Sequence, residues 1–262
     1  MRPEILIRGA GEIASAIAHA LHGAKCRVAL QVSRPPIAIR RLMAFSDAAF
    51  KGSADLEGRR ARRIDHGTET EQVWATDDIP LLYMAFDAAI AARPWSVLVD
   101  ARMNKQQAPD VQIGLAPLVI GLGPGCTAGH NVDIGVETSW DGLGAIIRQG
   151  STLPLAGEPR AILGQARSRF RYAPQAGILC AEAEIGERVR AGQVIARIGQ
   201  APITASFDGI LRGLTHDGVP VEKGNKIAEI DPRPGAVKLA GIDERPRRLA
   251  EAVVAIVADL PD

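Results

Sequence analysis

The sequence predicts an α/β fold: a Rossmann-like domain with a parallel sheet, then a β barrel-sandwich hybrid domain, similar to biotinyl and lipoyl domains, and a C-terminal helix. Three observations predict it. A strand, a glycine turn, a helix and a second strand follow one another at the N-terminus. A short β motif occurs twice in tandem near the C-terminus, and the last apolar residues have helical spacing. We expect domains at 1–166 and 167–232, with a linker and docking helix at 233–262; a single large α/β domain is the alternative.

The first strand is expected at residues 4–8, directly before a turn with two glycines. A helical pattern then runs to about His22, with Ile13, Ile17 and Leu21 on one face. A second strand follows at 27–32. This strand–helix–strand series is typical of a parallel sheet.

Further strands are expected at 79–84, 96–101, 118–120 and 132–137, and a helix at 86–92. Between Pro36 and Arg63 the pattern is irregular. Its end carries four arginines within the segment Arg59–Arg63, and we expect a charged loop there.

The tandem motif begins with Gly177-Ile178-Leu179 and begins again with Gly209-Ile210-Leu211. Each copy continues with a G-x-x-V-x-x-G step and a closing strand, as in a flattened β-barrel. Carrier domains of that fold bear a modified Lys on the hairpin between the halves. The joining segment here, 199–203, has no Lys, which argues against biotin and lipoate as cofactors.

The last helix is expected at about Arg245–Asp259, where Leu249, Val253 and Ile256 lie at helical spacing.

Composition narrows the functional classes. Hydrophobic residues make up 47% of the chain and charged residues 23%, and the net charge is only +1, so we expect neither nucleic acid nor a membrane surface as partner. The longest apolar run, 114–125, is too short and too rich in Gly and Pro to span a bilayer. An early strand leaves no room for a signal peptide, so a cytoplasmic location is expected. The spacing of the Cys and His residues predicts no disulfide and no metal site.

The first candidate site is the turn Gly9-Ala10-Gly11-Glu12-Ile13-Ala14, a G-x-G-x-x-A form of the dinucleotide fingerprint. Small residues allow a pyrophosphate to approach the positive end of the following helix. Glu12 is unfavourable because it adds negative charge there. The second strand ends in Ser33 and Arg34 rather than an acid, which suits an NADP-like 2′-phosphate or another anion better than NAD. The alternative is that the glycines serve chain reversal only.

The second candidate is the glycine-rich loop after the strand at 118–120, where Gly121, Gly123, Gly125 and Thr127 could present backbone N–H groups to an anion. Cys126 is a weaker candidate for a nucleophile, because no orienting carboxylate is identifiable.

A third candidate is the pair Arg40 and Arg41, which could reach a phosphate or carboxylate but equally suits a solvated surface.

Several segments resemble the selenium-dependent molybdenum hydroxylase system protein family, the YqeB family. The matching segments, in the family's order, are IRGAGEIAS, RPPIAIRRLMAFSDAAFKG, APLVIGLGPGCTAGHNVDIGVET, IIRQGSTLPLAG and the DGILRGL…GVPVEKGNKIAEIDPR ending. The resemblance implies a Rossmann-like part, a barrel-sandwich part and a role in maturing or supplying a molybdenum enzyme. The site residues to which it adds weight are Gly9, Gly11, Arg40, Arg41, Gly121, Gly123, Gly125 and Thr127.

The chain departs from the family at residues 139–142, where Ser-Trp-Asp-Gly stands in place of a basic R-G-H segment. If that segment binds ligand in the family, the link to selenium transfers poorly to this chain, and whether selenium is involved stays open.

The leading hypothesis is therefore an accessory or maturation protein for a molybdenum hydroxylase, whose subunits would be its partners. Its ligand would be a nucleotide, a dinucleotide or a molybdopterin-type molecule. The sequence leaves open whether the protein forms a homo-oligomer. The alternatives are an NAD(P)-dependent oxidoreductase with an added barrel domain and a non-catalytic scaffold. The oxidoreductase lacks a recognisable proton donor, since Tyr83 and Tyr172 have no partner at a catalytic spacing.

Overall fold

The computed structural model describes residues 2–103, 108–154, 159–235 and 237–260, and its chain divides into two compact units. The first unit comprises Met1–Arg34, Ala44–Ala156 and Ile242–Asp262. The second comprises Pro35–Met43 and Gly157–Gly241. Both units are discontinuous in sequence, because the crossover segment Pro35–Met43 belongs to the second and the C-terminal helix to the first.

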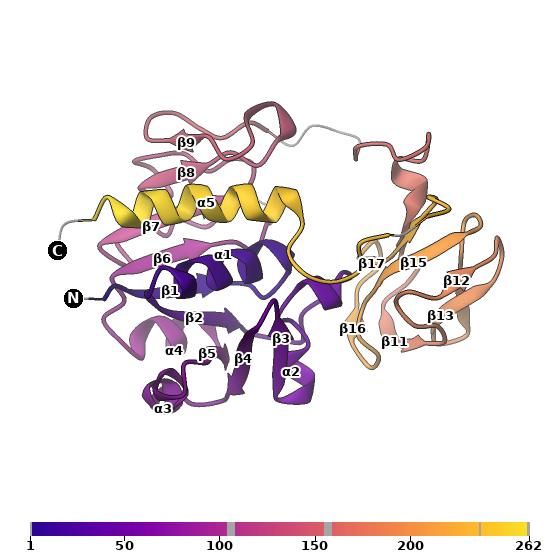
Figure 1. The fold of residues 1–262 in the computed structure, drawn as a ribbon, viewed down its shortest axis with the longest axis horizontal. Helices are drawn as coiled ribbons and strands as arrows, with labels where there is room; N and C mark the ends of the chain where they lie inside the picture. The colour runs from indigo at the N-terminus through magenta and orange to yellow at the C-terminus, as the bar shows by residue number, and fades with distance from the viewer. Residues whose placement is uncertain (1, 104–107, 155–158, 236, 261–262) are drawn as a thin grey trace. The chain divides into compact units, whose positions relative to one another are not determined.

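The first unit contains a nine-stranded, mostly parallel sheet in the order β3-β4-β5-β2-β1-β6-β7-β8-β9 (Figure 1). Neighbouring strands pair in parallel except at the two edges, where β3–β4 and β8–β9 are antiparallel. The strands are β1 (Glu4–Arg8), β2 (Arg27–Val32), β3 (Ser53–Leu56), β4 (Arg59–Ile64), β5 (Ile79–Tyr83), β6 (Val97–Asp100), β7 (Leu118–Leu122), β8 (Ile134–Val136) and β9 (Ile146–Ile147).

The order of the strands reverses between β1 and β6. From β1 the chain passes outward to β2 and later to β5, then returns to the other side of β1 as β6, β7 and β8. The resulting order β5-β2-β1-β6-β7-β8 is that of dinucleotide-binding sheets, which bind ligands outside the carboxyl ends of the strands where the order reverses. Any site predicted from these strands must therefore be sought at the ends of β1, β6 and β7.

The charged loop expected at Arg59–Arg63 is wrong: these residues form β4. Ala61 and Ile64 are buried, whereas Arg60 and Arg62 are exposed and pair with acids of neighbouring segments. A strand tolerates so many arginines because long side chains extend into solvent from its exposed positions. Only two buried apolar residues mark the strand, so its pattern was easily mistaken for a loop.

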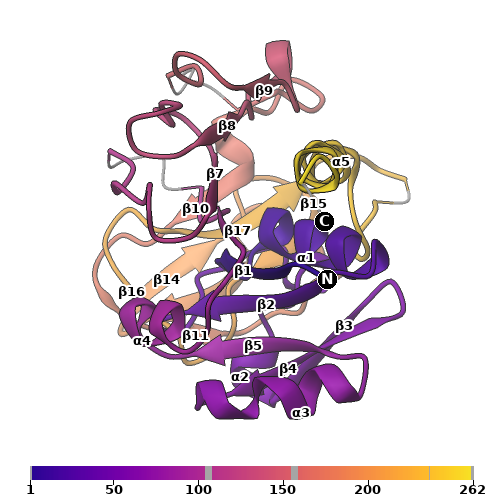
Figure 2. The same ribbon diagram turned by 90° about the vertical axis from the view of Figure 1, so that its left-hand side faces the viewer.

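Two long helices lie side by side on one face of the sheet (Figures 1 and 2). The first, α1 (Glu12–Gly23), buries Ile13, Ile17 and Leu21, and the second, α5 (Glu244–Ala258), buries Leu249, Val253 and Ile256. Both helices were predicted with these buried faces. Trp95 and the apolar residues of α3 and α4 pack on the opposite face, so the sheet is covered on both sides.

The remaining helices of the described chain are short. They are α2 (Ala48–Lys51), α3 (Thr70–Ala75), α4 (Phe86–Ala91) and the 3₁₀ turns η1 (Arg41–Met43), η2 (Gly67–Glu69), η3 (Trp140–Gly142) and η4 (Arg167–Arg169). Among the described residues, no helix combines the length and apolar character that crossing a membrane requires.

The second unit consists of two four-stranded antiparallel sheets, β10-β17-β15-β12 and β14-β13-β11-β16. The strands are β10 (Phe170–Tyr172), β11 (Gly177–Ala181), β12 (Arg188–Val189), β13 (Val194–Ile198), β14 (Ala201–Thr204), β15 (Gly209–Leu214), β16 (Pro220–Val221) and β17 (Lys226–Asp231).

These strands follow the repeat found in the sequence. Strands β10 to β13 of the first copy correspond to β14 to β17 of the second, and exchanging the copies converts the strand order of one sheet into that of the other. Each sheet therefore contains two strands of each copy. The predicted joining hairpin is the turn at Gly199 and Gln200 between β13 and β14.

Candidate ligand-binding site

The predicted glycine turn lies at the reversal of the strand order. Gly9 follows β1 directly and has a φ of 110°, a conformation that favours glycine. A Cβ on Gly9 would come within 3.5 Å of the backbone of Ala101 and Arg102, just after β6. Gly11 is the N-cap of α1, and nothing lies within 4 Å of where its Cβ would be. The turn is therefore closed toward β6 at Gly9 and open at Gly11.

The two polar residues predicted beside this turn lie on either side of it. Glu12 is the first residue of α1, where the helix dipole stabilises a negatively charged carboxylate. Arg34 is exposed just beyond the carboxyl end of β2, the strand that pairs with β1. The preceding Gln31 fixes this end: its backbone oxygen accepts a 2.8 Å bond from the amide of Gly9, and its amide group donates to Ser33 Oγ at 2.9 Å.

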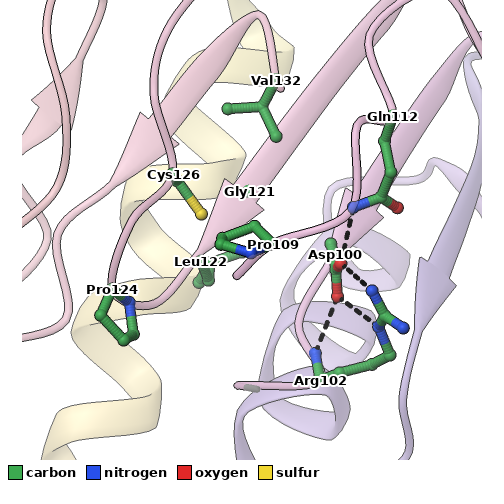
Figure 3. A pocket seen from close by; sticks show the side chains of 9 residues that line it. All are labelled: Asp100, Arg102, Pro109, Gln112, Gly121, Leu122, Pro124, Cys126 and Val132. Atoms are coloured by element: carbon green, nitrogen blue, oxygen red, sulfur yellow. Dashed lines mark hydrogen bonds and ion pairs between the residues drawn. The ribbon is translucent and has the colours of Figure 1, made fainter. Parts of the chain in front are cut away.

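A group of polar side chains, which we call the carboxyl-edge cluster, lies at the ends of β1 and β6 and in the loop after β6. Its members are Arg8, Asp100, Arg102, Asp110 and Gln112. Figure 3 shows Arg102 and Gln112 converging on Asp100. Arg102 donates from Nε and Nη2 to the two carboxylate oxygens at 2.9 and 2.6 Å, and Gln112 donates to Oδ2 at 2.6 Å.

The neighbouring arginines keep the two carboxyl groups of this cluster, Asp100 and Asp110, in their ionised form. Burial alone would raise the pKa of Asp100, but the hydrogen bonds and positive charge of Arg102, with the charge of Arg8, hold it below the usual range. Arg102 lowers the pKa of Asp110 through a hydrogen bond. Both carboxylates are therefore ionised at neutral pH.

Arg8 is the most enclosed cation of the cluster, at 7% exposure. Its Nη1 donates to Gln112 at 2.7 Å and to Asp110 at 3.1 Å, and its guanidinium carbon lies 3.7 Å from the centre of the Phe86 ring. Within the described part of the chain, its buried Nε has no hydrogen-bond partner.

Beside the cluster lies a small cavity lined by nine residues (Figure 3): Asp100, Arg102, Pro109, Gln112, Gly121, Leu122, Pro124, Cys126 and Val132. Its volume is about 10 Å³, room for one water molecule. A ligand larger than water does not fit inside this cavity.

Several backbone N–H groups of the glycine-rich loop after β7 donate to neighbouring protein groups. The amide of Cys126 donates to Thr152 Oγ1, that of Thr127 to Asn131 Oδ1, and that of Ala128 to the Gly150 oxygen. These three N–H groups are engaged within the protein and do not converge on an anion. The side chain of Thr127 shares a 2.8 Å hydrogen bond with Ser151.

The glycines of this loop have different roles. Gly121 belongs to β7, where a Cβ would lie 2.7 Å from Val132 Cγ1 and 2.8 Å from Cys126 Sγ, so close packing requires it. Gly123 and Gly125 have φ values of 115° and 78°, which favour glycine. A Cβ on Gly123 would lie next to Met103, and one on Gly125 next to Pro109.

Cys126 is packed as a core residue. It is 4% exposed, and burial, with the negative charge of Asp100, raises the pKa of its thiol to about 12. The thiol is therefore protonated at neutral pH, which agrees with the sequence-based preference against a nucleophile.

Arg40 and Arg41 belong to the second unit. Arg40 forms a bidentate pair with the fully buried Glu229, at 2.7 and 3.1 Å, and Arg41 Nε donates to the Leu214 oxygen at 2.7 Å. These contacts join the crossover segment Pro35–Met43 to β15 and β17 within one unit.

Sequence reasoning missed the carboxyl-edge cluster. Arg8 and Gln112 are 104 residues apart, and their contact depends on the fold. One signal was present: Arg8 and Asp100 are charged residues that directly follow apolar runs at the ends of their strands, at the edge where parallel sheets bind ligands. Among the described residues, this cluster included, no three His, Cys, Asp or Glu side chains gather as ligands for a metal ion.

Comparison with known proteins gives one clear sequence relative. No family model matches the chain. Among solved structures, the apo ectoine utilization protein EutE (DoeB) of Ruegeria pomeroyi aligns over 88% of this chain and 86% of its own, with 12% identity and a TM-score of 0.26. An aspartoacylase family protein of Mesorhizobium loti aligns over 89% and 86%, with 12% identity and a TM-score of 0.26. TM-scores this low do not establish a common fold.

The uncharacterized protein YqeB of Escherichia coli (strain K12) is 34% identical over 253 residues, which are 95% of this chain but only 46% of that protein. The chain thus spans about half the length of the curated relative it matches. On this identity and coverage, the chain is a homologue of YqeB.

Proposed function

We propose that the first unit is a Rossmann-like domain that binds a nucleotide or a nucleotide-bearing cofactor, and that the protein is an accessory or maturation protein for a molybdenum hydroxylase. In this proposal the second unit is a barrel-sandwich hybrid without a carrier Lys, which packs or docks and carries no prosthetic group. Partners would be the subunits of the client enzyme, and the ligand would be an NADP-like or molybdopterin-type molecule.

The position of the turn Gly9–Ala14 carries the proposal. A G-x-G-x-x-A segment alone is a weak signal, but this one joins β1 to α1 where the strand order reverses. In such sheets the pyrophosphate of a dinucleotide lies over the glycine turn and receives hydrogen bonds from the first N–H groups of the helix. The open space at Gly11 suits that approach.

The end of β2 favours a ligand with a further phosphate. Dinucleotide sites for NAD carry an acid there, which binds the ribose hydroxyls, whereas an Arg suits a 2′-phosphate. Here Ser33 and Arg34 follow the strand, and both are exposed.

An oxidoreductase is less well supported by the residues at the strand ends. Hydride transfer to a carbonyl requires a proton donor near neutral pKa. Asp100 and Asp110 are ionised, and no His, Tyr or Lys lines the cavity among the described residues. The molybdenum connection rests on the family resemblance of the sequence segments and on no contact in the structure.

Titration calorimetry with NADP⁺, NAD⁺ and ATP tests ligand binding directly, and a thermal-shift series provides a second readout because a ligand specific to the folded state raises the melting temperature. We expect NADP⁺ to bind more tightly than NAD⁺. Gly11→Ala should weaken binding about tenfold, because its added methyl group meets no protein atom within 4 Å and would meet the ligand. Ala is a poorer N-cap than Gly, so the ligand-free melting temperature is compared as well.

Gly235→Ala is the matched control, since it adds the same methyl group in open space in the second unit. The nucleotide proposal is wrong if none of the three ligands binds, or if both substitutions have the same effect. The accessory role is tested separately by the activity of a molybdenum hydroxylase matured with wild-type or Gly11→Ala protein. Full client activity without this protein would contradict that role.

A further inference from the structure

We propose that Arg8 and Arg102 form an oxyanion-binding site in which the carboxylate of Asp110 occupies the position of a ligand's phosphate or carboxylate group. This inference deepens the proposed function, on which it rests, because it adds two positively charged side chains to the backbone N–H groups of the glycine turn. Asp110 then acts as an internal competitor that a ligand must displace.

First, Arg8 and Arg102 both donate to the same carboxylate oxygen of Asp110. Asp110 Oδ2 accepts from Arg8 Nη1 at 3.1 Å and from Arg102 Nη2 at 2.7 Å. Two guanidinium groups from the ends of neighbouring parallel strands thus converge on a single carboxylate oxygen. Converging arginines bind phosphate and carboxylate groups in the same way, through charge-assisted hydrogen bonds.

The second step is a difference in burial. The side chains of Arg8 and Arg102 are 9% and 27% exposed, whereas that of Asp110 is 54% exposed. Asp110 can therefore leave by rotating its side chain into solvent, but the arginines are held by the sheet. A ligand anion can take its place while the rest of the ligand stays outside the strand ends.

The third step is the unused donor. Arg8 Nε–H is buried and has no partner among the described residues, which costs free energy unless some group accepts from it. A carboxylate contacts Arg8 at Nη1 only. Arg8 therefore keeps one strong donor without an acceptor, on the side of the guanidinium away from Asp110.

The fourth step is the charge balance. Arg8 and Arg102 carry two positive charges, and Asp100 and Asp110 carry two negative ones. Asp100 is tied to Arg102 and Gln112 by short hydrogen bonds within the sheet edge, so it is not displaceable. Removing Asp110 alone leaves one positive charge, which an anionic ligand neutralises.

The test substitutes Asp110→Asn in the full chain and measures binding of inorganic pyrophosphate and, separately, of malonate by titration calorimetry. We expect the variant to bind pyrophosphate about tenfold more tightly than the wild type, because the competing charge is gone. Tighter pyrophosphate than malonate binding would identify the ligand group as phosphate, and the reverse would identify it as carboxylate. A gain of affinity cannot result from misfolding.

Asp55→Asn is the matched control. It removes another exposed carboxylate, at 64% against 54% for Asp110, from an ion pair with Arg60 in the same unit and should leave both affinities unchanged. Nitrogen-15 NMR of the variant provides a local readout: the Arg8 Nε–H resonance should shift on addition of the anion and saturate with it.

Unchanged affinity in Asp110→Asn, an equal gain in Asp55→Asn, or a static Arg8 signal would each overturn the inference. These outcomes are distinct from failure of the nucleotide proposal. NADP⁺ binding that depends on Gly11 but not on Asp110 would refute only this inference. Pyrophosphate binding without any nucleotide binding would refute only the other.

Discussion

Replacing Glu229 with Gln should loosen the second unit more than any surface substitution. Glu229 is fully buried in β17 and pairs with three arginines: Arg40, Arg169 and Arg212. Burial alone would raise the pKa of this carboxyl, but the hydrogen bond and charge of Arg40 and the charges of the other two arginines lower it. Gln keeps the shape and removes the negative charge, so the three arginines lose one counter-ion, while the buried Asp231 still acts on Arg169 and Arg212.

The magnitude follows from the burial of the partners. The side chains of Arg169 and Arg212 are 5% and 6% exposed, so solvent screens them little, whereas Arg40 at 20% is screened more. Breaking a buried ion pair by removing one partner costs about 3 to 5 kcal/mol, because the remaining charge stays buried. We take about 3 kcal/mol here, since Arg40 can regain water.

Native-state hydrogen exchange measures this loss where it should occur. The amide of Leu214 donates to the Ile39 oxygen at 2.8 Å and so reports on the attachment of the crossover segment to β15. About 3 kcal/mol corresponds to roughly a hundredfold faster exchange when exchange follows the opening equilibrium. Amides of β1 and β2, in the first unit, should keep their rates.

Glu182→Gln is the control. Its carboxylate forms a 2.6 Å ion pair with Arg197 in the same unit, but both side chains are about 40% exposed, and such pairs contribute roughly 0 to 1 kcal/mol. Exchange at Leu214 should hardly change in this variant. An effect of Glu229→Gln smaller than threefold, or equal to that of Glu182→Gln, would refute the reasoning that Glu229 neutralises buried charge.

Three further outcomes are expected. Gly121→Ala should lower the free energy of unfolding in urea by about 1 to 3 kcal/mol, because its methyl group would overlap Val132; wild-type stability would show that the strand adjusts. A thiol reagent should modify exposed Cys180 in the native protein and Cys126 only after unfolding; equal rates would contradict the buried, protonated thiol. Burial would raise the pKa of Glu137, but three backbone N–H donors lower it overall. The ionised carboxylate therefore stabilises the fold above about pH 5, and this stabilisation is lost as the pH falls through the folded pKa. Wild type and Glu137→Gln should therefore converge in stability as the pH falls through the folded pKa, and a constant difference would refute this assignment.

Local patterns carried much of the fold. The segment from β1 to β2 was predictable because each element shows its own period within a few residues, and α5 was predictable for the same reason. The repeat was predictable because its turns need glycine: Gly186 and Gly218 occupy equivalent positions and both have positive φ. β4 was missed because its buried positions are few.

The site was predictable only where one segment forms it. The glycine turn is contiguous, so its place between β1 and α1 could be anticipated. The carboxyl-edge cluster joins residues about a hundred positions apart, and no local pattern pairs Arg8 with Gln112. Arg40 was selected from a conspicuous motif, but its partner Glu229 is 189 residues away and lay outside any spacing argument.

The interleaved composition of the two units constrains how the protein can be made. When the strands of the first unit's sheet have left the ribosome, α5 has not yet been made. The side of α1 that α5 covers therefore stays exposed while all of 157–241 is synthesised. The two β repeats are equally interdependent, because each sheet needs strands from both. Folding must therefore await distant segments, which is slow and exposes apolar surface on the way. Nascent chains that stop before α5 should be ready substrates for chaperones and proteases.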